Sequence, residues 1–251
     1  MKIVLTFDIE RDIPGVFNSY LGVKIGLKKI LDILDEFKIK GTFFCTGAIA
    51  EQLPEHIILI EQHNHEIACH SLSHERLSRL DYDTCFKSIQ QNKRLLEELC
   101  QKSEIVGFRA PYLKPPLFLY EILDELGFRY DSSGTPSKKS KNYQYDNSKI
   151  LKVPPSNFNA FFRLPLNLRM LFNRIYKKEL SILYFHPWEA IDMKSLISEQ
   201  KDPFSKYKNL LFRPDRWFNT GDTFLNRLRT FIARALSRNL VFFTLKELIE
   251  R

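Results

Sequence analysis

The histidines at positions 70 and 74 are the pair of residues that most directly predicts chemistry. The apolar run Ile67 to Cys69 before them is typical of a short buried strand, so His70 is expected where that strand ends. His74 is expected one helical turn further along, where its imidazole can face the same point as that of His70. Two imidazoles arranged in this way can bind a divalent metal, which needs at least one further protein ligand.

Two carboxylates follow the first predicted strand, Ile3 to Phe7. In an extended chain Asp8 and Glu10 point to the same side, while Ile9 between them points to the core. Carboxylates in such a position can bind a metal or accept a proton. Each feature alone also fits an ordinary turn or a solvated helix face, because short motifs often match by accident.

Polar residues also follow two other predicted strands. Residues 105–108 lead into Arg109-Ala110-Pro111-Tyr112, and residues 182–185 lead into His186-Pro187-Trp188-Glu189. In barrels of parallel strands, reactive side chains collect at the carboxyl ends of the strands. The four segments together therefore predict an active site assembled from several strand-to-helix loops.

The elements needed to position these residues alternate along the first half of the chain. Apolar periodicity predicts strands over 42–45, 67–69, 105–108 and 128–130, and helices over 22–37, 48–62, 82–100 and 116–126. Further strands are predicted over 150–153, 182–185 and 241–244, with a short helix to 251. This order indicates an α/β fold, a distorted (β/α) barrel whose parallel strands are wrapped by helices. We expect residues 1–251 to form a single domain.

Three segments lack a clear place in this pattern. Residues 132–149 are polar and are expected to be a loop, and the long connection from 187 to 240 is expected to act as a lid or binding loop. Residues 157–178 interleave aromatic and apolar side chains with arginines and lysines. Such a segment can lie on an anionic membrane surface, or it can pack on the barrel as an ordinary helix with its cations extended into solvent.

Charge and composition narrow the classes of partner. Lysine and arginine number 38 against 30 acidic residues, a net charge of +8, which favours phosphate-bearing partners. We expect no nucleic acid, because neither a recognition helix nor a stacking motif is visible. The sequence shows no signal-peptide pattern and no apolar run long enough to cross a bilayer, and its four cysteines form no C-x-x-C pair. A cytoplasmic location is expected, with peripheral contact to the inner membrane face remaining open.

The four polar segments resemble, in order, the motifs of the polysaccharide deacetylases, also known as carbohydrate esterase family 4 or the NodB-homology domain. That family carries T-F-D-D, H-[ST]-x-x-H, R-x-P-Y and L-x-x-H. This chain has T-F-D at 6–8, H-S-L-S-H at 70–74, R-A-P-Y at 109–112 and L-Y-F-H at 183–186. The resemblance covers residues 1 to about 130 and again 182–189.

The resemblance implies a divalent metal, with Zn²⁺ expected, and a place for each ligand. The family's metal-binding aspartate directly follows the catalytic one, but here that position is Ile9. Glu10, on the same face as Asp8, is expected to replace it as the third ligand beside His70 and His74.

The resemblance also assigns the remaining roles. Asp8 would take a proton from water, Arg109 would orient Asp8, and His186 would protonate the departing amine. The backbone N–H of Tyr112 would stabilise the oxyanion. Substrate contacts are expected from Pro111, Leu183, Trp188 and Asp131. Asp131 stands where a further motif of the family, between R-x-P-Y and L-x-x-H, has an aspartate that supports the histidine or the arginine.

The expected function is hydrolysis of an N-acyl group, in the first place N-acetyl, from an amino sugar. The substrate is expected to be an intermediate of surface-polysaccharide or glycolipid synthesis, carried on a lipid or a nucleotide. Two alternatives stay open. The loss of the second aspartate to Ile9 would allow a metal-independent C–N hydrolase on the same fold, or the barrel could be a carbohydrate- or lipid-binding domain without catalysis.

Overall fold

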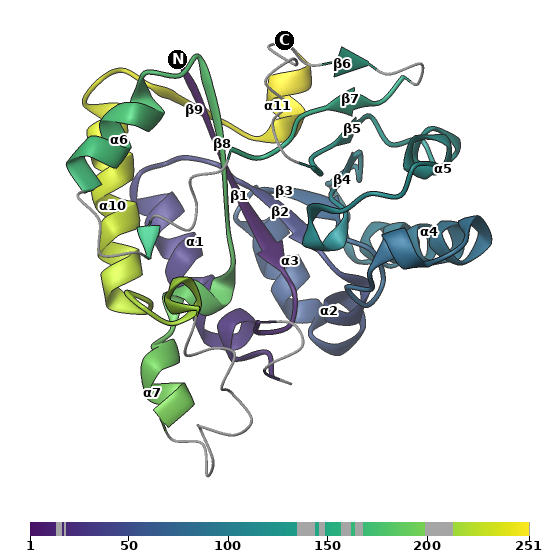
Figure 1. Cartoon of the computed structure of the whole chain (residues 1–251), viewed down its shortest axis with the longest axis horizontal. Helices are drawn as coiled ribbons and strands as arrows, with labels where there is room; N and C mark the ends of the chain where they lie inside the picture. The colour runs from purple at the N-terminus through teal and green to yellow at the C-terminus, as the bar shows by residue number, and fades with distance from the viewer. Residues whose placement is uncertain are drawn as a thin grey trace.

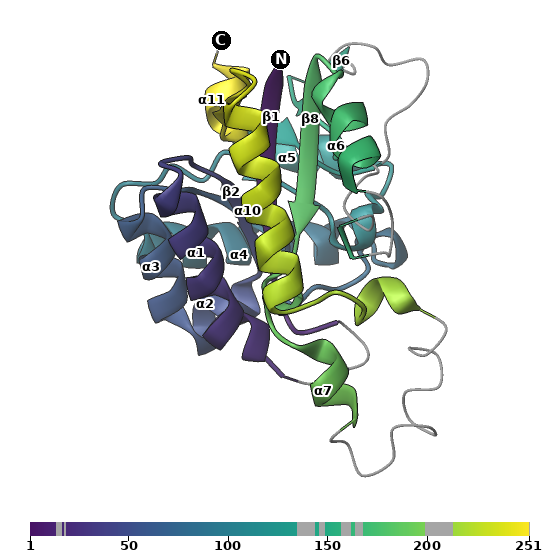
Figure 2. The same ribbon diagram turned by 90° about the vertical axis from the view of Figure 1, so that its left-hand side faces the viewer.

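The computed structural model describes residues 1–13, 17, 19–134, 144–145, 149–156, 162–163, 168–198 and 213–250. Its centre is a nine-stranded sheet in the order β6-β7-β5-β4-β3-β2-β1-β8, with β9 also paired to β1. Both chain ends lie at the same end of the molecule, opposite the carboxyl ends of β1 and β8 (Figures 1 and 2).

The strands run parallel, apart from β6, which pairs antiparallel with β7. The sheet curls far enough that the backbone N–H of Ser156, beyond β7, donates to the carbonyl of Ile182 in β8 at 2.7 Å. The predicted distorted barrel is therefore confirmed. The strands are β1 Lys2–Ile9, β2 Thr42–Cys45, β3 Glu66–Cys69, β4 Gly107–Phe108, β5 Tyr130–Asp131, β6 Gln144–Tyr145, β7 Leu151–Lys152, β8 Leu180–Phe185 and β9 Val241–Phe243.

Helices connect the strands and cover the outside of the sheet (Figure 2). The predicted helix over 22–37 is a π-helical turn, Gly22–Gly26, that continues into α1, and the predicted helix over 48–62 is broken at Pro54 into α2 and α3. The helices are α1 Leu27–Glu36, α2 Gly47–Gln52, α3 Pro54–Gln62, α4 Tyr82–Leu99, α5 Leu119–Glu125, α6 Leu168–Tyr176, α7 Met193–Ser198, α10 Asp222–Leu236 and α11 Leu245–Ile249.

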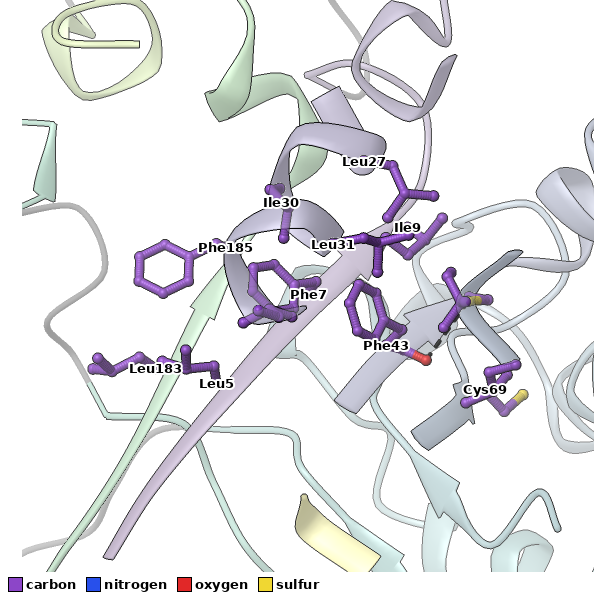
Figure 3. Close-up of a cluster of buried hydrophobic side chains, with 14 of the residues drawn as sticks. Leu5, Phe7, Ile9, Leu27, Ile30, Leu31, Phe43, Cys69, Leu183 and Phe185 are labelled. Carbon is purple, nitrogen blue, oxygen red and sulfur yellow. Dashed lines mark hydrogen bonds between the residues drawn. The ribbon is translucent and has the colours of Figure 1, made fainter. Parts of the chain in front are cut away.

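Side chains of β1 alternate between two cores. Leu5, Phe7 and Ile9 point outward and pack with α1 residues and with Phe43 and Phe185 of the neighbouring strands (Figure 3). Val4 points inward, into a second core inside the curl that α11 closes with Leu245 and Leu248. Because successive strand residues face opposite sides, Thr6 and Asp8 follow Val4 on the inner face. The carboxyl end of the inner face is therefore lined by polar groups.

The long connection after His186 is more ordered than expected. It contains α10, whose Phe231 is fully buried and packs against Phe172 and Tyr176 of α6, with ring centroids 5.1 and 5.2 Å apart. The expectation of one continuous loop or lid over 187–240 is wrong for 222–236, because this stretch buries an apolar face. The part of that expectation over 199–212 lies outside the described residues.

The other two segments are described only in part. For α6, the structure supports a helix packed on the barrel, since Phe172, Ile175 and Tyr176 are buried. Within the expected loop over 132–149, the structure places strand β6, and 135–143 and 146–148 lie outside the described residues. Among the helices that the structure describes, none is long and apolar enough to cross a membrane.

Candidate active site

Glu10, His70 and His74 meet at the carboxyl end of the sheet. Glu10 directly follows β1 and is 3% exposed. Its Oε2 lies 3.3 Å from Nε2 of His70 and also contacts Nε2 of His74. One donor atom from each residue lies within 4.8 Å of the other two. A carboxylate and two imidazoles around one point are a donor set that suits Zn²⁺.

The backbone that brings the two histidines together differs from the expected helical turn. Residues 70–76 are irregular, with φ of 61° at Ser71 and 60° at His74. Left-handed conformations are unfavourable for residues with a side chain and are often found at functional sites. Glu75 stabilises this segment, because its Oε2 accepts hydrogen bonds from the N–H of Ser73 at 2.8 Å and from Oγ of Ser71 at 3.3 Å.

The hydrogen bonds and charges around the cluster favour cation binding. Burial on its own would raise the pKa of Glu10, but the charge of His74, the hydrogen bonds of His70 and His74 and the charge of His186 outweigh burial and lower that pKa. Nδ1 of His70 donates to the carbonyl of Arg109 at 2.7 Å, which leaves Nε2 to face Glu10. A second-sphere bond of this kind fixes the orientation of a metal-binding imidazole. The residues present therefore fit a divalent ion.

Asp8 is held by a buried arginine. Nη1 of Arg109 lies 2.6 Å from Oδ1 of Asp8 and 2.9 Å from Oγ1 of Thr6, while Nε and Nη2 donate to the carbonyl and hydroxyl oxygens of Ser132. The guanidinium also stacks 4.0 Å from the ring centroid of Phe44. This leaves Oδ2 of Asp8 directed toward His186, whose Nε2 lies 4.0 Å away.

Asp131 supports the loop that carries Arg109. It is buried, and its carboxylate accepts from the N–H of Ser133 at 3.1 Å and from the hydroxyl of Tyr120 at 3.2 Å. Ser133 Oγ in turn accepts from the N–H of Ala110 at 2.7 Å. Burial raises the pKa of Asp131 to about 6. Asp131 thus supports the loop that carries Arg109 through Ser133. It has almost no exposed surface with which to contact a substrate. The expectation that Asp131 binds substrate is not supported.

Tyr112 lies beside the histidines on a strained turn. The 3-10 turn Pro111–Leu113 has φ of 59° at Tyr112, and Pro111 is buried within it. Tyr112 is 44% exposed, and its ring centroid is 4.7 Å from that of His74. The guanidinium of Arg76 lies 4.8 Å from the same ring. Sequence reasoning did not include Arg76, although it follows His74 by two residues.

The side chains of β8 correct one expectation about the acyl pocket. Leu183 is fully buried in the outer core beside Leu5 and Phe185 (Figure 3), so it does not face the site. Tyr184 lies on the same side of the chain as His186. Its ring centroid is 5.8 Å from that of His186 and 5.6 Å from the guanidinium of Arg109. The two-residue period of a strand, counted back from His186, could have identified Tyr184.

Trp188 is also placed differently from the expectation. It is 1% exposed, and its ring stacks on His186 with centroids 5.2 Å apart and an interplanar angle of 26°. It therefore packs behind the histidine and offers no wall to a substrate. The π-helical turn that precedes α1 contacts this segment closely, because a Cβ on Gly26 would lie 2.1 Å from the carbonyl oxygen of Pro187.

The comparison with family models agrees with this geometry. The model described as "Polysaccharide deacetylase" matches residues 1–130, just over half of the chain. The chain belongs to the polysaccharide deacetylase family. The match ends at Tyr130, the first residue of β5, and the resemblance to L-x-x-H at 183–186 lies beyond it.

Curated relatives and solved structures extend the comparison. The chain is 30% identical over 84 residues to a chitooligosaccharide deacetylase of Sinorhizobium fredii, which is 34% of this chain and 39% of that protein. It is 31% identical over 115 residues to a peptidoglycan-N-acetylglucosamine deacetylase of Bacillus cereus, which is 46% of this chain and 36% of the relative. The match to these curated relatives thus spans less than half of their length.

Two solved structures share the fold over nearly the whole chain. A family 4 carbohydrate esterase from Streptomyces lividans, in complex with acetate, superposes with a TM-score of 0.59 at 12% identity, covering 96% of this chain and 91% of the other. A CE4 family pseudoenzyme from Bacillus anthracis superposes with a TM-score of 0.62 at 15% identity, covering 98% of this chain and 64% of the other. At these identities the likeness concerns the fold.

Proposed function

We propose that this member of the family is a metal-dependent hydrolase that removes an N-acetyl group from an amino sugar. The observation that carries the proposal is the convergence of Glu10, His70 and His74 beside the Asp8–Arg109 pair and His186. A donor set for a cation, a carboxylate base and an imidazole acid within one polar site are the groups that amide hydrolysis requires.

A divalent ion such as Zn²⁺, held by Glu10, His70 and His74, would supply Lewis acidity toward the amide carbonyl and the attacking water. Asp8 accepts the proton that this water loses, and Arg109 keeps the carboxylate in place through its 2.6 Å contact. The backbone N–H of Tyr112 donates a hydrogen bond to the oxyanion. Nε2 of His186 delivers a proton to the amine nitrogen as the C–N bond breaks.

The proposed substrate is an N-acetylated sugar intermediate linked to a lipid or nucleotide phosphate. Arg76 supports this class, since its guanidinium stacks on Tyr112 next to His74, and Arg11 directly follows Glu10 and is exposed. With a net charge of +8, the surface attracts phosphate groups. A cytoplasmic location with peripheral contact to the inner membrane face belongs to the same proposal.

Metal content and acetate release test the mechanism together. Protein purified without added metal and then soaked in zinc is expected to hold about one ion per chain, as a single three-ligand site implies. Asp8→Asn should abolish acetate release from an N-acetylated amino sugar and keep the metal, whereas Glu10→Ala should lose both. Full metal content in Glu10→Ala would show that another residue is the third ligand.

The two alternatives predict different outcomes of the same assays. Acetate release without bound metal, even after zinc soaking, would identify a metal-independent hydrolase. Sugar binding without acetate release across a broad panel would identify a binding domain. Ile9, in place of the second aspartate, is the reason to test the metal-independent hydrolase, and the structural similarity to a CE4 pseudoenzyme is the reason to test the binding domain.

A charge variant tests the substrate class. Arg76→Gln is expected to lower kcat/KM for a phosphate-linked N-acetylamino sugar about tenfold, because one charge-assisted hydrogen bond is lost. Hydrolysis of an uncharged chitooligosaccharide should be unaffected by the same change. An equal decrease for both substrates would contradict recognition of phosphate by Arg76.

A further inference from the structure

His186 presents its two ring nitrogens to different surroundings. Nε2 faces the site, 3.7 Å from Oε1 of Glu10 and 4.0 Å from Oδ2 of Asp8. Nδ1 points away from the site and lies 3.1 Å from Oε1 of Glu189. A carboxylate oxygen only accepts hydrogen bonds, so this contact places the proton on Nδ1.

Glu189 is attached to the histidine twice. The oxygen that contacts Nδ1 also accepts the backbone N–H of His186 at 3.1 Å, as part of the cap of the 3-10 turn Pro187–Ala190. One carboxylate oxygen therefore fixes both the backbone and the ring of His186. The remaining face of the ring stacks on Trp188. Rotation of the imidazole would break a hydrogen bond and a ring contact.

The charge of Glu189 is compensated inside the protein. Glu189 is 0% exposed, and a buried carboxylate is costly unless it is paired. Its Oε2 forms an ion pair with Nη1 of Arg163, which is itself 2% exposed. The carbonyl of Arg163 accepts from Nδ2 of Asn219 at 2.7 Å, and its guanidinium lies 5.0 Å from the Trp188 ring centroid. The arginine is thus anchored by segments far from it in the sequence.

Asp131, which the sequence suggested as a support for the histidine or the arginine, bonds to Ser133 and Tyr120 on the arginine side. We propose that Glu189, held by Arg163, is the positioning residue that keeps Nδ1 of His186 protonated and the ring fixed, so that the second proton of the imidazolium lies on Nε2, directed at the departing amine. This inference rests on the proposed function for the role of Nε2. The position of the Nδ1 proton can be measured independently of any activity.

The kinetic experiment uses Glu189→Gln in the zinc-loaded protein, with two kinds of acetyl compound. With an N-acetylated amino sugar, kcat should fall about 10–100-fold, the usual effect of losing a second-sphere partner, with KM nearly unchanged. With 4-nitrophenyl acetate the decrease should be small, because the phenolate leaves without needing a proton. Equal decreases with both compounds would overturn the proposal.

Glu36→Gln is the matched control. It makes the same chemical change in an exposed carboxylate that pairs with Nε of Arg229 at 2.9 Å. Both activities and the metal content should stay at the wild-type level. The metal content and the thermal unfolding of Glu189→Gln are measured as well. These measurements identify a decrease in kcat that is caused by loss of the metal or of the fold.

Glu189→Gln also removes the ion pair with Arg163, so a measurement on the unmodified protein complements the variant. In the long-range ¹H–¹⁵N spectrum of the zinc-loaded protein labelled with ¹⁵N-histidine, His186 should show a protonated Nδ1. A bare Nδ1 would overturn the proposal even if the enzyme is active. A protonated Nδ1 in a protein that releases no acetate would support the contact and refute the proposed function alone.

Discussion

Nη1 of Arg109 lies 2.6 Å from Oδ1 of Asp8, although 101 residues separate the two in the sequence. Both side chains are buried, and the guanidinium makes further hydrogen bonds to Thr6 and Ser132. The pair links β1 to the loop after β4 across the inside of the barrel. A planar, forked cation is suited to hold a carboxylate in one orientation while it bonds to other groups.

Arg109→Lys is therefore expected to be strongly damaging despite the retained charge. A lysine cannot reach Asp8, Thr6 and Ser132 together, and disruption of a buried pair costs about 3–5 kcal/mol when one partner is lost. We expect a lower free energy of unfolding, measured by urea denaturation, and a large decrease in acetate release. Arg129→Lys, an exposed ion-pair partner of Glu104, is the control and should change little. Wild-type stability and turnover in Arg109→Lys would contradict the assigned role.

Gly26→Ala should disturb the segment that carries His186. A Cβ at this position would lie 2.1 Å from the backbone carbonyl oxygen of Pro187, and a backbone atom cannot move away cheaply. Overpacking of this kind costs about 1–3 kcal/mol. Thermal unfolding and kcat should both decrease, whereas Lys24→Ala, at an exposed position of the same turn, should affect neither. If Gly26→Ala keeps wild-type kcat, the contact between the two turns is not needed to place His186.

The pH dependence of stability should reveal the buried carboxyl of Asp131. Burial raises its pKa from 3.8 to about 6, so the folded state binds this proton more tightly than the unfolded state. Below the unfolded pKa the carboxyl is protonated in both states, so Asp131 does not destabilise the folded state. Its contribution to the free energy of unfolding becomes unfavourable as pH rises through the folded pKa. A rise of about 2 in pKa corresponds to about 3 kcal/mol.

The difference between Asp131→Asn and wild type isolates this effect, since other titrating groups cancel. The free energy of unfolding of the variant, relative to wild type, should increase from pH 4 to pH 7 by up to about 3 kcal/mol, as measured by denaturant titration. Asp124→Asn, a change at an exposed position of α5, provides the reference. Parallel pH curves for Asp131→Asn and wild type would show that the carboxyl titrates normally.

Phe231→Ala should test whether α10 is part of the core. The ring is fully buried and packs against Phe162, Phe172 and Tyr176. Truncation of a buried phenylalanine costs about 3–5 kcal/mol because it leaves a cavity. A calorimetric scan should show a clear decrease in Tm, and the neighbouring exposed Thr230→Ala should not. A Tm decrease no larger than that of the control would mean that α6 and α10 close over the gap.

The local pattern of the sequence was sufficient to predict most strands and to place Asp8 and Glu10 on the same side of the chain. A strand alternates its side chains with a period of two, so Ile9 had to point to the outer core once the strand was recognised. The same rule, applied to β8, separates Tyr184 and His186 from Leu183. The order of the four motif segments along parallel strands also placed their polar residues at one edge, because carboxyl ends of parallel strands lie together.

The tertiary structure decided which partner each buried polar group takes. The segment with positive φ at Ser71 and His74, in place of a helical turn, is held by a hydrogen bond from the N–H of Leu72 to the hydroxyl of Ser88 in α4, a contact that no local pattern encodes. Asp131 ends β5 and Glu189 follows β8, and of these two acidic residues only Glu189 contacts His186. Arg163 reaches Glu189 from a segment with no motif of its own. Sequence period fixes the side of a strand on which a side chain lies. The charge and hydrogen-bond partners of that side chain are set by packing between segments that are distant in the chain.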